Sequence, residues 1–266
     1  MSESEILVLD SATKFGPDSP GKIAIAASHG AIYAGYLGAR AGLRGIILHD
    51  AGIGRDGAGI NSLPYLDAFG VAAATVDHHS ARIGDGASMA KTGRISHVNE
   101  TARAAGCTIG QTAMACARAM HAAPGCTGKP PPLDEARFLI RDTDGLPRII
   151  GCDSVSLVGP DDAGDIVITA SHGALLKGAP SWGNRPDVLA AVFNDAGSAL
   201  PTRLPDLDLR GIAGATVSAE SARIGDARST HEDGIISHVN DTARKSGAVP
   251  GMTCLDFVQL MTAAKR

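Results

Sequence analysis

The sequence predicts an α/β protein made of two copies of one βαβαβ unit, each with a parallel sheet, related by pseudo-twofold symmetry. The segment LDSATKFGPDSPGKIAIAASHGA from Leu9 aligns without a gap to CDSVSLVGPDDAGDIVITASHGA from Cys152. The block SARIGD also occurs twice, from Ser80 and from Ser221. The third observation is the alternation of short apolar runs with helical stretches, an order typical of parallel strands joined by crossover helices.

The repeats divide the chain into a first α/β repeat over residues 1–125, a Pro-rich linker and hairpin over 126–147, and a second α/β repeat over 148–266. Three consecutive prolines at 130–132 indicate an extended linker. Residues that persist in both repeats are needed either by the shared fold or by two related sites.

The elements of the first unit follow from its apolar runs. KIAIAAS (22–28) predicts a buried strand, and AIYAGYLGARAG predicts a helix that ends at Gly42. LRGIILH (43–49) predicts a second strand. A short helix is expected to open at Ser62, since serine is a good N-cap and a proline follows in the first turn. VAAATV (71–76) predicts the third strand.

A last helix is predicted over ISHVNETARAAG, with Ser96 as its cap and His97 at its start. The order strand, helix, strand, helix, strand implies right-handed crossovers within one sheet.

Composition excludes several classes of partner. Lys and Arg are scattered and aromatic residues make up 3% of the chain, so no nucleic-acid partner is predicted. No stretch approaches the roughly 18 apolar residues of a membrane span, so no membrane partner is predicted. The five cysteines lack CxxC spacing, and the acidic N-terminal segment without a long apolar run is not expected to be a signal peptide, so we expect a cytoplasmic protein with reduced thiols. A homo-oligomer is left open.

Ser28-His29-Gly30 ends the first predicted strand, and the same tripeptide recurs around His172. Ligands of open α/β sheets bind outside the carboxyl ends of strands, so we predict His29 and His172 as catalytic residues. Ser28 and Gly30 are predicted to contact substrate. The alternative is that each histidine only caps its strand end.

Asp50 follows the second predicted strand, and Asp195 has the same place in the second repeat. Tips of neighbouring strands lie about 5 Å apart, so His29 and Asp50 are predicted to form a catalytic His–carboxylate pair. The alternative is an Asx turn, in which the carboxylate accepts hydrogen bonds from backbone N–H groups.

The glycines Gly52, Gly54 and Gly57 form a GxGxxG pattern that only the first repeat has. A dinucleotide site is disfavoured, because the next helix begins near Ser62, too late for its N-terminus to hold a pyrophosphate. We predict a mobile substrate-binding loop instead.

Arg82 of the first SARIGD block and Arg223 of the second are predicted to bind a substrate anion, since guanidinium groups hold carboxylates with two hydrogen bonds. The alternative is an ion pair with Asp85, or with an aspartate of the other repeat. His97, in ISHVN, is predicted to contact substrate, with capping and packing as the alternative.

Asp77, His78 and His79 form a run that only the first repeat contains, since the second repeat has Ser-Ala-Glu there. A metal ion held by His29, Asp50 and His78 is a less favoured alternative, because neither HExxH nor CxxC spacing is present. No cofactor is predicted.

The order of the SHG and DAG tripeptides resembles that in caspase-like proteins, whose catalytic histidine also follows a strand as His-Gly. Their catalytic cysteine ends the next strand, and Asp50 stands at that place here. The resemblance therefore implies topology and not protease activity.

We expect an enzyme, a hydrolase or lyase, that acts on a small polar or anionic molecule through His29 and Asp50. The first repeat is expected to be the active half, because it alone has His49, the glycine loop and the Asp-His-His run. One alternative is a non-catalytic small-ligand binding or regulatory module. Another is an isomerase or racemase with one base from each half.

Overall fold

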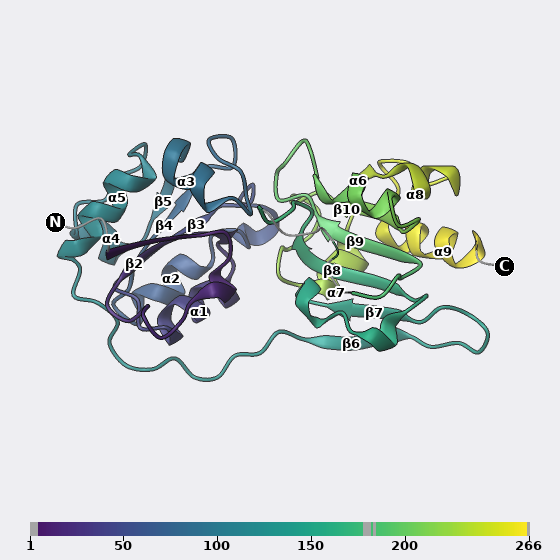
Figure 1. Ribbon diagram of the computed structural model, residues 1–266, viewed down its shortest axis with the longest axis horizontal. Helices are drawn as coiled ribbons and strands as arrows, with labels where there is room; N and C mark the ends of the chain where they lie inside the picture. Colours follow the sequence, from purple (N-terminus) through teal and green to yellow (C-terminus); the bar gives the residue numbers. More distant parts are fainter. Residues whose placement is uncertain (1–4, 178–181, 183–184, 265–266) are drawn as a thin grey trace. The chain divides into compact units, whose positions relative to one another are not determined.

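The computed structural model describes residues 5–177, 182 and 185–264, which form an α/β protein with two mixed sheets (Figure 1). The chain divides into two compact units. The first comprises Met1–Ile53 and Gly57–Asp134, and the second comprises Gly54–Asp56 and Glu135–Arg266.

The first unit contains a five-stranded sheet in which the strands follow one another in chain order. They are β1 (Ile6–Leu9), β2 (Ile23–His29), β3 (Gly45–His49), β4 (Ala72–Val76) and β5 (Ile95–Val98). The first four are parallel, and β5 is antiparallel to β4. The predicted strands β2, β3 and β4 are confirmed, while the prediction of an entirely parallel sheet is corrected by β5.

Helices cover both faces of this sheet (Figure 1). They are α1 (Ile32–Arg40), α2 (Ser62–Asp67), α3 (Gly86–Thr92), α4 (Glu100–Ala104) and α5 (Ala113–Ala119), with 3₁₀ turns η2 (Ala12–Lys14) and η4 (Met120–Ala122). A further 3₁₀ turn, η3 (Arg55–Gly57), has its first two residues in the second unit. Successive residues of a strand point to opposite faces. Ile46 accordingly packs with α1 and α2, and Ile47 packs with α3, α4 and α5.

The segment ISHV is a strand and not the start of a helix. The helix begins after Asn99, whose side chain accepts hydrogen bonds from the backbone N–H groups of Ala102 (2.9 Å) and Ala73 (2.8 Å). Because Asn99 caps α4 and also anchors β4, Ser96 and His97 are left upstream in β5. The predicted cap at Ser96 is therefore wrong.

The second unit contains a six-stranded sheet in the order β11-β10-β9-β8-β7-β6. Its strands are β6 (Arg137–Arg141), β7 (Ile149–Cys152), β8 (Ile166–His172), β9 (Ala190–Asn194), β10 (Ala213–Val217) and β11 (Ile236–Val239). Strands β7 to β10 are parallel, and the edge strands β6 and β11 are antiparallel to their neighbours. Both faces of the sheet carry a buried apolar cluster.

The helices of the second unit are α6 (Arg203–Asp208), α7 (Ala227–Asp233), α8 (Asp241–Lys245) and α9 (Cys254–Ala264), with 3₁₀ turns η5 (Val155–Leu157) and η6 (Pro160–Asp162). Trp182 and Phe193 are among its largest buried side chains, and their rings meet edge to face at 6.3 Å. Within the described ranges, no helix combines the length and the apolar character needed to cross a membrane.

Candidate functional site

The carboxyl ends of β2, β3 and β4 lie next to one another in the first unit. His29 is in register with His49 on the neighbouring strand, and His49 is in register with Val76. The residues that follow these strands therefore gather at one edge of the sheet. The prediction that His29 and Asp50 lie at adjacent strand tips is confirmed.

Asp50 has His78 as its histidine partner. Its Oδ1 lies 2.9 Å from Nδ1 of His78, and it accepts hydrogen bonds from the backbone N–H groups of His78 and Gly52, both at 3.1 Å. The predicted direct bond between His29 and Asp50 does not form, because the loop after β4 turns back over β3 and brings His78 to the carboxylate. The Asx turn that we considered as the alternative is present, with the imidazole added to it.

The contact with Asp50 determines which nitrogen of His78 carries the proton. A carboxylate only accepts hydrogen bonds, so Nδ1 is the donor and Nε2 of the neutral ring keeps its lone pair. The His78 side chain is 19% exposed and that of Asp50 is 2% exposed. Among the described residues, Nε2 of His78 has no hydrogen-bond partner, so this nitrogen is available to a substrate or an ion.

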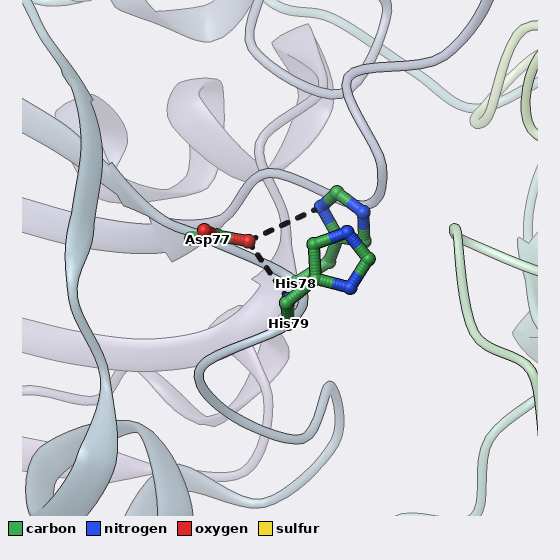
Figure 2. A group of neighbouring side chains, drawn as sticks. All are labelled: Asp77, His78 and His79. Atoms are coloured by element: carbon green, nitrogen blue, oxygen red, sulfur yellow. Dashed lines mark hydrogen bonds and ion pairs between the residues drawn. The ribbon is translucent and has the colours of Figure 1, made fainter.

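His79 and Asp77 stand beside His78 (Figure 2). The two imidazole rings are tilted by 42° to each other, with their centroids 3.9 Å apart. Oδ1 of Asp77 accepts a hydrogen bond from the backbone N–H of His79 at 2.8 Å and lies 3.6 Å from Nδ1 of His78. One ligand atom from each of the three residues lies within 4.8 Å of the other two.

His49 has a buried side chain with two hydrogen bonds to the backbone. Its Nδ1 accepts from the N–H of Ala51 at 3.1 Å, so Nε2 is the protonated nitrogen and donates to the carbonyl of Ala81 at 3.2 Å. Burial lowers the pKa of His49. The ring is therefore a neutral link between the β3 and β4 loops.

The second unit builds the same two loops without a histidine. Asn194 follows the pattern of His49: its amide oxygen accepts from the N–H of Ala196 at 2.8 Å, and its amide nitrogen donates to the carbonyl of Ala222 at 3.1 Å. Asp195 accepts hydrogen bonds from the N–H groups of Gly197 (2.9 Å) and Ala219 (3.0 Å). The carboxylate turn is therefore common to both units, and in the first unit the imidazole of His78 is added to it.

His29 ends β2 with its Nδ1 buried and, in the described part of the chain, without a hydrogen-bond partner. Burial, and then the charge of the neighbouring His49, lower its pKa from 6.5 to about 4. The ring is therefore neutral at pH 7. A catalytic role for His29, and for His172 at the end of β8, stays a prediction.

Ser28 and Gly30 make close contacts with the protein itself. The Ser28 hydroxyl accepts a hydrogen bond from the N–H of Ala12 at 2.9 Å. A Cβ atom on Gly30 would overlap the carbonyl oxygen of Gly59, so the glycine loop packs directly on this strand end. These contacts explain both residues without a ligand, and substrate binding by them stays a prediction.

Gly52, Gly54 and Gly57 all have positive φ, between 68° and 75°, so the loop needs glycine for its backbone conformation. No long helix starts at this loop: α2 begins at Ser62. A dinucleotide site is disfavoured for that reason, and substrate binding by the three glycines stays a prediction.

The two arginines of the SARIGD blocks differ. The Arg82 side chain is exposed and forms no ion pair with any described residue. Arg223 pairs with Asp226 (3.0 Å) and with Asp56 (2.9 Å), which belongs to the second unit. Arg223 therefore forms ion pairs, as the alternative to anion binding expects. Arg82 keeps a guanidinium available for an anion.

His97 lies in β5 opposite Thr75, with its Nδ1 buried and without a partner among the residues described. Asp85 is the N-cap of α3, where its carboxylate accepts a hydrogen bond from the N–H of Ser88 at 2.9 Å. This helix was not predicted. The prediction that His97 stands at the start of a helix is wrong. Its contact with substrate stays a prediction.

Comparison of the chain with protein-family models, with curated proteins and with solved structures returned no match. The resemblance to caspase-like proteins therefore gains no support. The geometry around Asp50 and His78 is therefore the main indication of function. Sequence reasoning named His78 only as a metal ligand, and the sign that pointed to it was the replacement of Asp-His-His by Ser-Ala-Glu in the second repeat.

Proposed function

We propose that the first unit is the active part of a hydrolase or lyase that acts on a small polar or anionic molecule. In this proposal His78 is the acid–base group and Asp50 holds its ring. The observation that carries the proposal is the 2.9 Å contact between Asp50 Oδ1 and His78 Nδ1 at a strand end, with Nε2 left available.

This arrangement suits proton transfer at Nε2. The ring accepts a proton there from a water molecule or from the substrate, and the adjacent carboxylate stabilises the positive charge that develops. Asp50 is itself held by two backbone N–H groups, so it fixes the orientation of the ring and not only its tautomer. A positioned base of this kind typically contributes about two to four orders of magnitude in rate.

Two further residues have proposed roles in the same site. Neutral His29, at the neighbouring strand tip, is proposed as the second proton-transfer group. Arg82, four residues after His78 on the same loop, is proposed to bind an anionic group of the substrate because its guanidinium is exposed and unpaired among the described residues.

We also infer that the two units arose by duplication and that the second has lost the acid–base site. The repeated sequence blocks support this, as do the equivalent contacts of Asp50 and Asp195. Ala219 stands in the second unit where His78 stands in the first, so no imidazole faces Asp195 from that position. The pseudo-twofold relation between the units stays a prediction.

The test compares His78→Ala with the intact protein and with His49→Asn on a panel of small esters, amides and hydroxy acids. Any turnover found should fall at least a hundredfold in His78→Ala and persist in His49→Asn. Full activity of His78→Ala would overturn the proposal. A small molecule that binds unchanged, with no turnover on the panel, would favour the binding module instead.

A further inference from the structure

The loop that follows β4 contains Asp77, His78 and His79, whose ligand atoms lie within 4.8 Å of one another (Figure 2). We propose that these three side chains bind one divalent transition-metal ion of the Zn²⁺ type. The inference goes beyond the proposed function, which needs no metal, although both involve His78.

The ligand set has the right chemistry for such an ion. Zn²⁺ binds imidazole nitrogen and carboxylate oxygen at about 2.0–2.2 Å in tetrahedral geometry, which places ligand atoms about 3.5 Å apart. The three ligand atoms now lie within 4.8 Å of one another, which is wider than that, so binding requires the side chains to turn until Nε2 of His78 and the other two ligand atoms reach one ion. Three protein ligands leave a fourth position for water or substrate.

Asp50 supports this site by bonding to the ring nitrogen of His78 that does not bind the ion. Histidines that bind metals commonly donate their other ring N–H to a carboxylate, which orients the ring and raises its basicity. Nδ1 of His78 has this partner in Asp50, at 2.9 Å, so Nε2 is the nitrogen left for the ion. The buried carboxylate would also offset part of the positive charge of the ion.

The fold does not require these side chains. In the first unit, Ser80 closes the turn by donating to the Asp77 carbonyl from its N–H (2.9 Å) and its hydroxyl (2.7 Å). In the second unit, Ser221 closes the corresponding turn by donating to the Ser218 carbonyl at 3.0 and 2.9 Å. Since the turn also forms with Ser-Ala-Glu, it does not depend on the acidic and imidazole groups of the first unit.

The test uses the full chain, freed of metal with a chelator and titrated with Zn²⁺ by calorimetry and with Co²⁺ by visible absorption. We expect one ion per chain and a cobalt spectrum typical of nitrogen and oxygen ligands. Asp77→Asn and His79→Ala should each weaken binding at least tenfold, while His121→Ala, outside the loop, should leave it unchanged.

A triple variant controls for loss of binding that is caused by misfolding. Asp77→Ser, His78→Ala and His79→Glu together copy the sequence that forms the same turn in the second unit, so this variant should fold and bind no ion at this loop. Absence of stoichiometric binding by the intact chain, or equal binding by the triple variant, would overturn the metal site.

Turnover separates this inference from the proposed function. The ion occupies the nitrogen that the reaction uses, so we expect Zn²⁺ to inhibit the metal-free enzyme. If turnover requires the ion instead, the acid–base role of His78 is wrong and the metal site stands. If turnover depends on His78 and no ion binds, the metal site alone is wrong.

Discussion

His49 in the first unit and Asn194 in the second make the same pair of hydrogen bonds, each accepting from the N–H two residues later and donating to the carbonyl of an alanine on the next loop. An imidazole and a carboxamide can replace each other here because both present one acceptor and one donor at similar separation. His49, which only the first repeat has, is therefore a structural link, and its neighbour Asp50 holds the imidazole of His78.

The first prediction concerns His49. His49→Asn should preserve both hydrogen bonds, so the unfolding free energy should change by less than about 1 kcal/mol. His49→Ala leaves the Ala51 N–H and the Ala81 carbonyl buried without partners, at about 1–3 kcal/mol for each. Urea unfolding of both variants measures the difference. An equal loss of unfolding free energy in the two variants would show that these hydrogen bonds do not contribute to stability.

The second prediction concerns the buried side chain of Asn99, which caps α4 and bonds to Ala73 and to the carbonyl of Val71 at 2.9 Å. Asn99→Ala should destabilise the first unit by about 2–4 kcal/mol, since it removes a cap and leaves buried backbone groups unpaired. The exposed neighbour provides a control: Glu100→Ala should change stability by less than about 0.5 kcal/mol. A small effect at Asn99 would contradict its anchoring role.

The third prediction is a pH dependence of stability. The pKa of His29 falls from 6.5 to about 4 on folding, because burial and then His49 disfavour the charged ring. Between these values the unfolded chain binds more protons than the folded chain, so stability falls as pH is lowered from 6.5 towards 4. His29→Gln should flatten this part of the profile, measured as melting temperature against pH. An unchanged slope would show that other groups cause it.

The extent to which the sequence predicts this structure differs from element to element. The runs that became β2, β3 and β4 consist mostly of Ala, Ile, Leu and Val, and each is recognisable without its neighbours. ISHV is short and contains Ser96 and His97, so its pairing with β4 depends on contacts distant in the chain. The helix α3 was missed because its sequence, GASMAKT, has few apolar residues.

The candidate site could likewise be predicted only in part from the sequence. That His29 and Asp50 meet at one sheet edge follows from the order of the strands, which the sequence predicts. The partner of Asp50 depends on the path of the loop after β4, which returns over β3 through the contact between Asp50 and the backbone of His78. No local pattern encodes that path, so His78 could be identified as the partner only from the structure.

The fourth prediction concerns Asp50. In Asp50→Asn the amide oxygen can still accept from the Gly52 and His78 N–H groups, so the turn and the melting temperature should be nearly unchanged. The uncharged amide no longer offers Nδ1 of His78 a negatively charged acceptor. Turnover should therefore fall by about two to four orders of magnitude. Asp195→Asn is the matched control in the second unit and should retain activity. Comparable loss in the control would place the site elsewhere.

The central claim is that Asp50 and His78 act as one unit, and a double-mutant cycle on kcat/KM tests it most directly. Residues that act together are strongly non-additive, because removal of either one already abolishes their joint effect. We predict that Asp50→Asn with His78→Gln is no slower than His78→Gln alone, within about a factor of three. Losses that multiply in the double variant, or full activity in His78→Gln, would contradict the account.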